Sequence, residues 1–235
     1  MARWAARLAA AGALVVIGGP VLYRVGAVGL AVGLLGVPLG ALLALVALVL
    51  SAIVLVGGRP TPSGRGVVLG ACALSALTGL GPVLLVAPGL RAPAIHDVTT
   101  DPDDPPRFEA IVPLRADAPN SLEYPPDTAA AQRDGYPELA TMTLSADPAA
   151  VVERARSVAT DLGWTVVAAD PTTGRVEASD TTFWFGFVDD VVVRIRPASG
   201  GSEVDVRSVS RVGGGDLGAN AARIRRFLER LRAGV

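Results

Sequence analysis

The first 96 residues of the chain contain no acidic side chain, and most of them belong to three long apolar runs. The runs span residues 8–22, 25–56 and 67–86. A helix of about 20 apolar residues is long enough to cross the hydrocarbon core of a bilayer. We therefore expect residues 1–91 to form a membrane region with about three transmembrane helices.

The sequence does not fix where the first helix ends and the second begins. The second run is longer than one crossing requires and too short for two. Part of residues 25–38 therefore extends the first helix, forms the connecting loop or accommodates a tilt. The first run begins after two arginines, as in a secretory signal peptide, but no small-x-small cleavage site follows it. We expect it to remain as a membrane helix.

The placement of arginines predicts the orientation. Six arginines flank the apolar runs, at positions 3, 7, 24, 59, 65 and 91. Four of them lie at the N-terminus and in the second loop, which share one side after two crossings. Because positive loops stay in the cytoplasm, we expect a cytoplasmic N-terminus and an extracytoplasmic C-terminal domain. The predicted location is the cell membrane, with several crossings.

The second run contains two GxxxG steps, formed by Gly29, Gly33, Gly36 and Gly40. Such steps let helix backbones approach closely. They predict either a homo-oligomer that associates through these glycines or packing among the helices of one chain.

The charge is concentrated in the C-terminal part. Residues 97–235 hold 15 of the 21 arginines and all 22 acidic residues, so their formal charge is −7. Nucleic-acid binding requires a basic surface that neutralises phosphates, so we expect no nucleic-acid partner. The only cysteine, Cys72, excludes a disulfide within the chain.

Residues 92–139 are rich in proline and aspartate. Nine of the 18 prolines lie between positions 93 and 137, which predicts an extended or looped segment without regular structure. Because apolar residues are scattered through it, we expect this segment to wrap the following domain.

Residues 140–235 alternate between strand and helix patterns. Strands are expected at residues 140–144, 164–170, 175–187, 191–196 and 204–209, where apolar side chains recur at every second position. Residues 188–190 are expected to form a turn. Asp147 with Pro148, and later Asp216, mark the beginnings of two helices. The apolar stripe of the last helix comprises Leu217, Ala221, Ile224, Leu228 and Leu231.

These elements predict an α+β domain in the order β-α-β-β-β-β-α. It contains an antiparallel sheet of about five strands with two packed helices, preceded by the three-helix membrane region. Arginines at positions 194, 196, 207 and 211 alternate with aspartates at 189, 190, 205 and 216. We expect cross-strand ion pairs on a solvated face, with a polar ligand cleft as the alternative.

Three blocks of sequence resemble one family. They are Ile95-His96-Asp97 with Thr99, Thr100 and Asp101; Trp184-Phe185-Gly186-Phe187 with Asp189-Asp190; and Ser208 to Asn220 with Arg223-Ile224. Residues 93–232 thereby resemble the bacterial domain-of-unknown-function family number 1499, whose members often carry N-terminal membrane helices. The resemblance implies no activity and no catalytic residue.

Any functional site is expected where His96-Asp97 meets the block from Ser208 to Arg223. The candidate ligand-binding residues are His96, Asp97, Asp101, Ser208, Ser210, Arg211, Asp216, Asn220 and Arg223. The competing interpretation is structural: Asp216 caps the last helix, Asn220 and Arg223 brace the glycine turn, and His96 anchors the preceding segment.

The sequence supports no specific chemistry. A single histidine beside aspartates lacks the spacing of a known metal site, so we expect no metal. The glycine-rich sequence before Asp216 lacks the Lys-Ser/Thr ending of a phosphate loop, and we expect no cofactor. There is neither a GxSxG elbow nor a second histidine for a triad. Catalytic residues are therefore left unassigned.

The composition and topology favour a membrane-tethered, extracytoplasmic binding or scaffolding module of the cell envelope. Its partner would be a membrane lipid, an envelope polymer or an envelope protein. The alternative is an envelope hydrolase that uses His96 and the nearby aspartates, which are Asp97, Asp101, Asp103 and Asp104.

Overall fold

A computed structural model describes residues 1–58 and 60–234. Arg59, one of the arginines used for the orientation, and Val235 lie outside this description. The chain divides into two compact units. The first unit comprises Met1–Pro88 with Trp184–Gly186, and the second comprises Gly89–Phe183 with Phe187–Val235.

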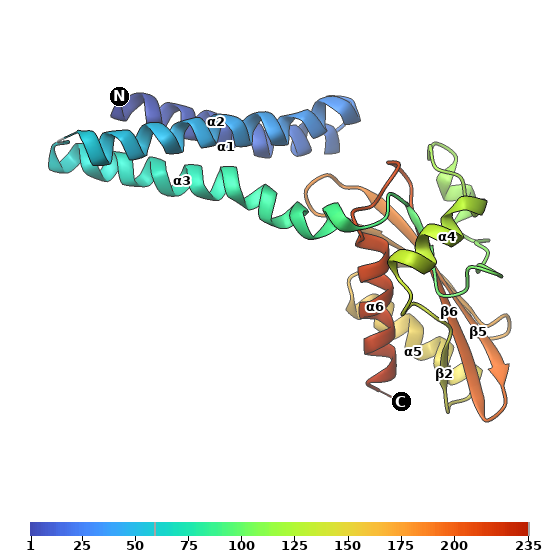
Figure 1. Cartoon of the computed structure of the whole chain (residues 1–235). Helices are drawn as coiled ribbons and strands as arrows, with labels where there is room; N and C mark the ends of the chain where they lie inside the picture. Colours follow the sequence, from blue (N-terminus) through green and yellow to red (C-terminus); the bar gives the residue numbers. More distant parts are fainter. Residues whose placement is uncertain (59, 235) are drawn as a thin grey trace. The chain divides into compact units, whose positions relative to one another are not determined.

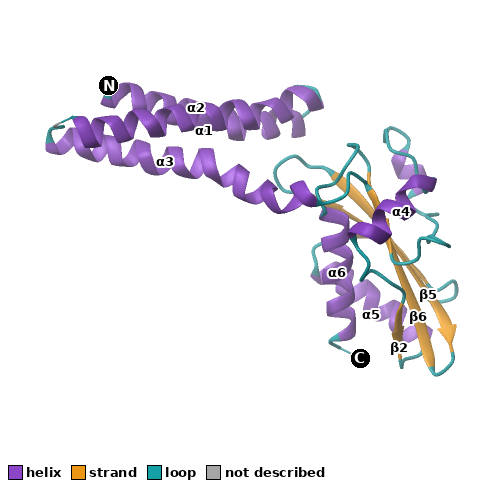
Figure 2. Cartoon of the chain, in the orientation of Figure 1, coloured by secondary structure: helices purple, strands orange, loops and turns teal. Residues whose placement is uncertain are grey.

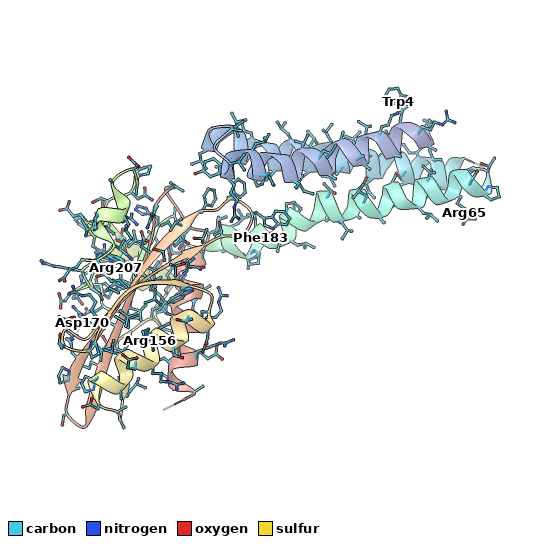
Figure 3. All side chains as sticks on the ribbon, turned by 180° about the vertical axis from the view of Figure 1, so that it is seen from behind. Trp4, Arg65, Arg156, Asp170, Phe183 and Arg207 are labelled. Carbon is cyan, nitrogen blue, oxygen red and sulfur yellow. The ribbon has the colours of Figure 1, made fainter. Side chains whose placement is uncertain are left out.

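Three helices make up most of the first unit: α1 (Ala2–Arg24), α2 (Leu30–Gly57) and α3 (Pro62–Val86) (Figure 1). Each is long and apolar enough to span a membrane, and the third candidate span continues through the short 3₁₀ helix η1 (Ala87–Arg91). Residues 25–29 form the connection between α1 and α2. Trp4 and Arg65 lie at the same end of the helices, as expected after two crossings (Figure 3).

The glycines of α2 are used for packing against α1. A Cβ atom at Gly36 would lie 2.9 Å from the Cα of Gly19, and one at Gly40 would lie 2.6 Å from the carbonyl oxygen of Gly12. Gly33 is buried as well, whereas a Cβ at Gly29 would meet nothing within 4 Å. Small residues thus allow the two backbones to approach within one chain. The homo-oligomer remains a prediction.

The second unit is an α+β domain built on a six-stranded antiparallel sheet (Figure 2). The strands are β1 (Asp97–Thr99), β2 (Met142–Leu144), β3 (Thr165–Asp170), β4 (Arg175–Thr181), β5 (Val188–Ala198) and β6 (Gly201–Ser210). Their order in the sheet is β1-β6-β5-β4-β3, and β2 also pairs with β6. A two-residue loop, Ser199-Gly200, joins β5 to β6, so these strands form a hairpin.

Two helices cover one face of this sheet, here called the helical face: α5 (Pro148–Asp161) and α6 (Ala219–Arg232). The alternation along β5 directs Val191, Val193 and Ile195 towards them, as predicted. Asp147 caps α5 by accepting a hydrogen bond from the backbone nitrogen of Ala149, which confirms the predicted start of that helix.

The proline-rich segment covers the opposite face, here called the outer face. Phe108 and Ile111 pack there against Val192 of β5 and Val209 of β6. This segment also contains a 3₁₀ helix, η2 (Val112–Arg115), and a helix, α4 (Pro126–Gly135). The side-chain amide of Gln132 in α4 pairs with both backbone groups of Thr99, so it continues the sheet beyond β1.

Four details differ from the sequence predictions. The segment from 93 to 137 contains β1 and α4, although its prolines predicted no regular structure. Residues 188–190 belong to β5, because they pair with β4 and β6 instead of turning. Strand β4 ends at Thr181, so it does not run through Phe187, and the Phe183 side chain is 78% exposed. Leu217 precedes α6 and is half exposed, so the apolar stripe begins at Ala221.

Candidate functional site

The pairing of β1 with β6 brings the two predicted segments together. Val98 lies opposite Ser208, and the backbone nitrogen of Ser210 donates a hydrogen bond to the carbonyl oxygen of His96. Residues more than a hundred positions apart in the sequence are thus neighbours in the sheet. The nine predicted site residues, however, are divided between its two faces.

On the helical face, Asn220 is the centre of a buried hydrogen-bond network. Its amide nitrogen donates to the carbonyl oxygen of His96 and to the hydroxyl of Ser210, both at 3.0 Å. Its amide oxygen accepts from the hydroxyl of Ser208 at 2.7 Å. Asn220, Ser208 and Ser210 are all buried. Because buried polar groups are costly without partners, this closed network ties α6 to β6 and to the residue before β1.

Arg223, one turn further along α6, completes the network. Its guanidinium donates to Asp189 at 2.6 Å and to Asp180 at 2.8 Å, and its remaining nitrogen donates to Asn220. Arg223 and Asp189 are buried. Removing one partner of such a pair strongly destabilises the folded protein, because the other charge is left buried and uncompensated.

The predicted helix start at Asp216 is two residues early, because Gly218 is the N-cap of α6 and Ala219 is its first residue. Asp216 nevertheless binds the start of the helix from outside it. Its carboxylate accepts hydrogen bonds from the backbone nitrogens of Gly218 at 2.8 Å and Asn220 at 2.7 Å. Gly218 has a φ of +82°, a conformation that is accessible to glycine and strained for other residues. Burial raises the pKa of Asp216, and the two backbone hydrogen bonds oppose this shift. The cap occupies the helix N-terminus that an anionic ligand would otherwise use.

On the outer face, Asp97 and Arg207 form a bidentate pair. Arg207 Nε and Nη2 donate to the two carboxylate oxygens of Asp97 at 2.9 and 2.6 Å. Both side chains are at least 97% buried. Burial raises the pKa of Asp97, and the hydrogen bond and charge of Arg207 counteract it. Arg207 also donates to the carbonyl oxygens of Pro106 and Leu122, so it fastens the proline-rich segment to the sheet.

Arg211 belongs to a second outer-face cluster, centred on Asp190. Two nitrogens of Arg211 donate to the two carboxylate oxygens of Asp190, each at 2.9 Å. The hydroxyl of Ser179 and the guanidinium of Arg115 donate to the same carboxylate. Burial acts to raise the pKa of Asp190, but these hydrogen bonds together hold it below its usual value. Asp190 is fully buried.

Asp101 belongs to a third cluster, at the edge of the outer face. Arg194 donates to Asp101 at 3.0 Å, to Asp104 at 2.8 Å and to the fully buried Asp205 at 2.9 Å. Arg194 and Arg196 pair with Asp205 across the two strands, as predicted, whereas Asp189 pairs with Arg223 of α6. The prediction that this face is solvated is wrong, because Asp205 is fully buried. The segment 101–125 lies over it, which the strand pattern does not reveal.

His96 is separate from this ionic chemistry. Its backbone oxygen has two hydrogen-bond partners, but its half-buried imidazole makes no hydrogen bond with any of the residues that the structure describes. The aspartates near it are paired with arginines: Asp97 with Arg207, Asp101 and Asp104 with Arg194, and Asp103 with Arg133. Within residues 1–58 and 60–234, no group of three or more His, Cys, Asp or Glu side chains is placed to hold a metal ion.

The outer face also carries a pocket that the sequence did not indicate. It has a volume of about 380 Å³, and its lining residues are Pro105, Arg107, Phe108, Val112, Leu122, Glu123, Tyr124 and Arg207. The Arg207 guanidinium lies 5.5 Å from the ring centre of Phe108 and 5.4 Å from that of Tyr124. These distances are typical of cation–π contacts. Burial raises the pKa of Tyr124 to about 12.

A sequence signal for this pocket does exist. Phe108 and Tyr124 are the only aromatic residues between positions 101 and 125, a segment rich in proline and aspartate. Of the predicted site residues, Asp97 is the one in direct ion-pair contact with a pocket-lining side chain, that of Arg207. The sequence prediction thus included a residue that supports the pocket, but none of the residues that line it.

Comparison with known proteins identifies the family but no activity. No curated protein matches the chain. A family model described as a protein of unknown function, DUF1499, matches residues 97–231, which is more than half of the chain and most of the second unit. The chain therefore belongs to the DUF1499 family.

Proposed function

We propose that this protein is a membrane-tethered binding or scaffolding module of the cell envelope, with its second unit on the extracytoplasmic side. Three helices of sufficient length and hydropathy support the tether. The excess of arginines at the N-terminus and in the second loop supports the orientation. The observation that carries the binding role is the outer-face pocket above Arg207.

The shape and chemistry of this pocket suit a ligand with an apolar body and a few polar groups. Phe108, Leu122 and Val112 supply apolar contact area. Arg107 and Glu123 are exposed beside them and could select charged groups of either sign. Ligand sites commonly combine an apolar wall with a small number of placed polar groups. An envelope lipid, a polymer segment or a loop of a partner protein has this chemistry.

We infer that the predicted site residues form the frame of the domain, and that the pocket takes the ligand. Ser208, Ser210, Asn220 and Arg223 bond to one another and to the strands beneath them. Asp97 holds Arg207 in the pocket floor. Changing these residues would alter binding through the position of Arg207 or through stability.

The hydrolase alternative has less support. General acid–base catalysis requires a histidine or carboxylate within hydrogen-bond reach of its reaction partner. Each aspartate that was considered for this role is paired with an arginine, and the imidazole of His96 contacts none of them through a hydrogen bond in the described part of the chain.

The test compares two substitutions on η2. Val112 lines the pocket, whereas Leu114 does not, and both side chains are about half exposed. Val112→Trp should obstruct the pocket, and Leu114→Trp is the matched control for added surface area. Full-length protein with each change would be purified from its membrane, and bound lipids, polymers and proteins would be identified by mass spectrometry. We expect a species that accompanies the wild type and Leu114→Trp but is lost with Val112→Trp. If the same species accompany all three forms, the pocket is not the binding site.

A further inference from the structure

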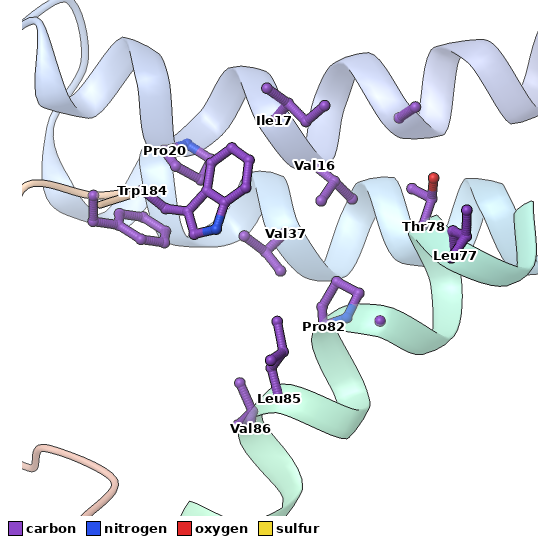
Figure 4. Close-up of a pocket in the computed structure, with 13 residues that line it drawn as sticks. Val16, Ile17, Pro20, Val37, Leu77, Thr78, Pro82, Leu85, Val86 and Trp184 are labelled. Atoms are coloured by element: carbon purple, nitrogen blue, oxygen red, sulfur yellow. The ribbon is translucent and has the colours of Figure 1, made fainter. Parts of the chain in front are cut away.

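A second pocket lies within the first unit, here called the membrane-helix unit (Figure 4). It has a volume of about 430 Å³. Its walls come from all three helices, with Ile17 and Pro20 on α1, Val37 on α2, and Leu77 and Leu85 on α3. Trp184, which belongs to the same compact unit, also lines it.

The positions of Gly79 and Pro82 explain why α3 leaves this groove. At Gly79, α3 lies close to α2, since a Cβ atom there would approach the side chain of Leu45 to 3.1 Å. Pro82 follows within the helix, and a proline removes one backbone hydrogen bond and kinks a helix. Beyond the proline, the Leu84 and Leu85 side chains are 71% and 79% exposed. The groove therefore opens where α3 stops packing closely against its neighbours.

The lining of the groove excludes water as a stable occupant. Among the lining side chains, only those of Thr78 and Trp184 carry a polar atom, and the others are hydrocarbon. A buried water requires two to four polar partners around it, and one hydroxyl and one indole N–H are too few to hold water throughout a groove of this volume. The helices are long and apolar enough to lie in a bilayer, where the abundant apolar molecules are lipid acyl chains. An acyl chain is the occupant that matches both the walls and the surroundings.

A positive charge lies one helical turn beyond the groove. Pro20 lines the groove, and Arg24 is four residues further on the same face of α1, at the last residue of the helix. This end of a membrane helix is placed at the level of the lipid headgroups. An arginine guanidinium binds phosphate oxygens through two parallel hydrogen bonds.

We propose that the groove binds one acyl chain of an anionic bilayer phospholipid, and that Arg24 holds the phosphate of the same molecule. The site is independent of the function proposed above, because it is built by the membrane helices whichever side the second unit occupies. It makes one lipid molecule a structural component of the helix bundle.

The groove can be filled without disturbing the helices. A Cβ atom at Gly81, which lines the groove, would meet nothing within 4 Å, so Gly81→Leu places a side chain in open space. Gly70 is equally open on the same helix and lies outside the groove, so Gly70→Leu is the matched control. Arg24→Gln removes the positive charge that is proposed to bind the headgroup. Arg65→Gln removes a positive charge at the opposite end of the helices and is its control.

The measurement uses full-length protein in phosphatidylcholine vesicles that contain a trace of phosphatidylglycerol with a photoactivatable group in its acyl chain. After irradiation, labelled residues are mapped by mass spectrometry. We expect labelling at Leu85 and Val86 to fall about tenfold in Gly81→Leu, because the added side chain replaces several buried methylenes, and to persist in Gly70→Leu. Uniform labelling of all three helices would contradict the acyl-chain site. An equal fall in labelling in both glycine variants would contradict it as well.

The headgroup contact has its own readout. With a phosphatidylcholine probe of the same chain, wild-type labelling should be about threefold weaker, the scale of a single exposed charge contact. Arg24→Gln should abolish this preference for phosphatidylglycerol, whereas Arg65→Gln should keep it. A preference that Arg24→Gln leaves unchanged would overturn the role of Arg24 while leaving the acyl-chain site supported.

Discussion

Trp164 and Phe227 form the central aromatic contact of the second unit. Their ring centres are 5.3 Å apart and the ring planes are inclined by 16°, an offset-stacked arrangement. Trp164 stands between α5 and β3, and Phe227 lies on α6, so this contact joins both helices to the sheet. Phe227 is fully buried. Phe183, by contrast, belongs to an aromatic turn and contributes nothing to this core.

This difference predicts the effect of two substitutions. Phe227→Ala should destabilise the second unit by about 3–5 kcal/mol, through lost burial and the cavity that remains. Phe183→Ala should change the free energy of unfolding by no more than about 0.5 kcal/mol, because its side chain is exposed. Urea unfolding of residues 93–235 measures both. Equal effects of the two changes would mean that the core is assigned to the wrong aromatic residues.

At the scale of the elements, the segment 101–125 is held in place by contacts with residues far along the chain. Glu177 on β4 is fully buried, and its carboxylate accepts hydrogen bonds from the backbone nitrogens of Glu109, Ala110 and Ile111. Together with Asp190 and Arg207, it fastens the segment to the outer face of the sheet. A strand would be held by backbone hydrogen bonds to its neighbour, but prolines have no N–H group to donate. Hydrogen bonds with the charged side chains hold this segment instead.

We therefore expect Glu177→Ala to release this segment locally. Loss of hydrogen bonds to a buried carboxylate should cost at least about 2 kcal/mol. The amides of residues 109–111 should exchange with deuterium much faster than in the wild type, as measured by mass spectrometry. Glu153→Ala, which removes a half-exposed glutamate paired with Arg156 on α5, is the control and should leave this exchange unchanged. Unaltered exchange in Glu177→Ala would show that other contacts hold the segment.

At the scale of the whole molecule, the distribution of charge separates the two units. The membrane-helix unit has no acidic residue. In the second unit, buried pairs of aspartate and arginine lie on both faces of the sheet. An uncompensated charge is expensive in hydrocarbon, so the sequence itself restricts which part of the chain can enter a bilayer.

The proposed orientation yields a direct prediction. Reporter fusions after Gly64 and after Val235 should report opposite sides of the membrane, with the first in the cytoplasm. The reason is the excess of arginines on that side. If both fusions report the cytoplasm, the three-crossing arrangement fails. If the two sides are exchanged, the number of crossings stands and the orientation is wrong.

The sequence alone determined the three long apolar helices, which are candidate membrane spans, and most strands of the sheet. Helices follow from apolar length, because every backbone polar group in hydrocarbon must be satisfied within the segment. Strands such as β5 and β6 follow from alternation, because successive side chains point to opposite faces. The chemistry of His96-Asp97 and of the Ser208–Arg223 block also indicated that these segments meet, and β1 pairs with β6.

Only the tertiary structure decided what covers the outer face. Alternation places Arg194 and Arg207 on that face but does not show whether water or protein lies over it. The segment 101–125 has no helical or strand period, so its position depends on contacts with residues far along the chain, such as Glu177. For the same reason, the alternating aromatics at 183–187 resembled a strand, although they form a turn. Periodicity reports the direction of a side chain, whereas burial depends on the partner that packs against it.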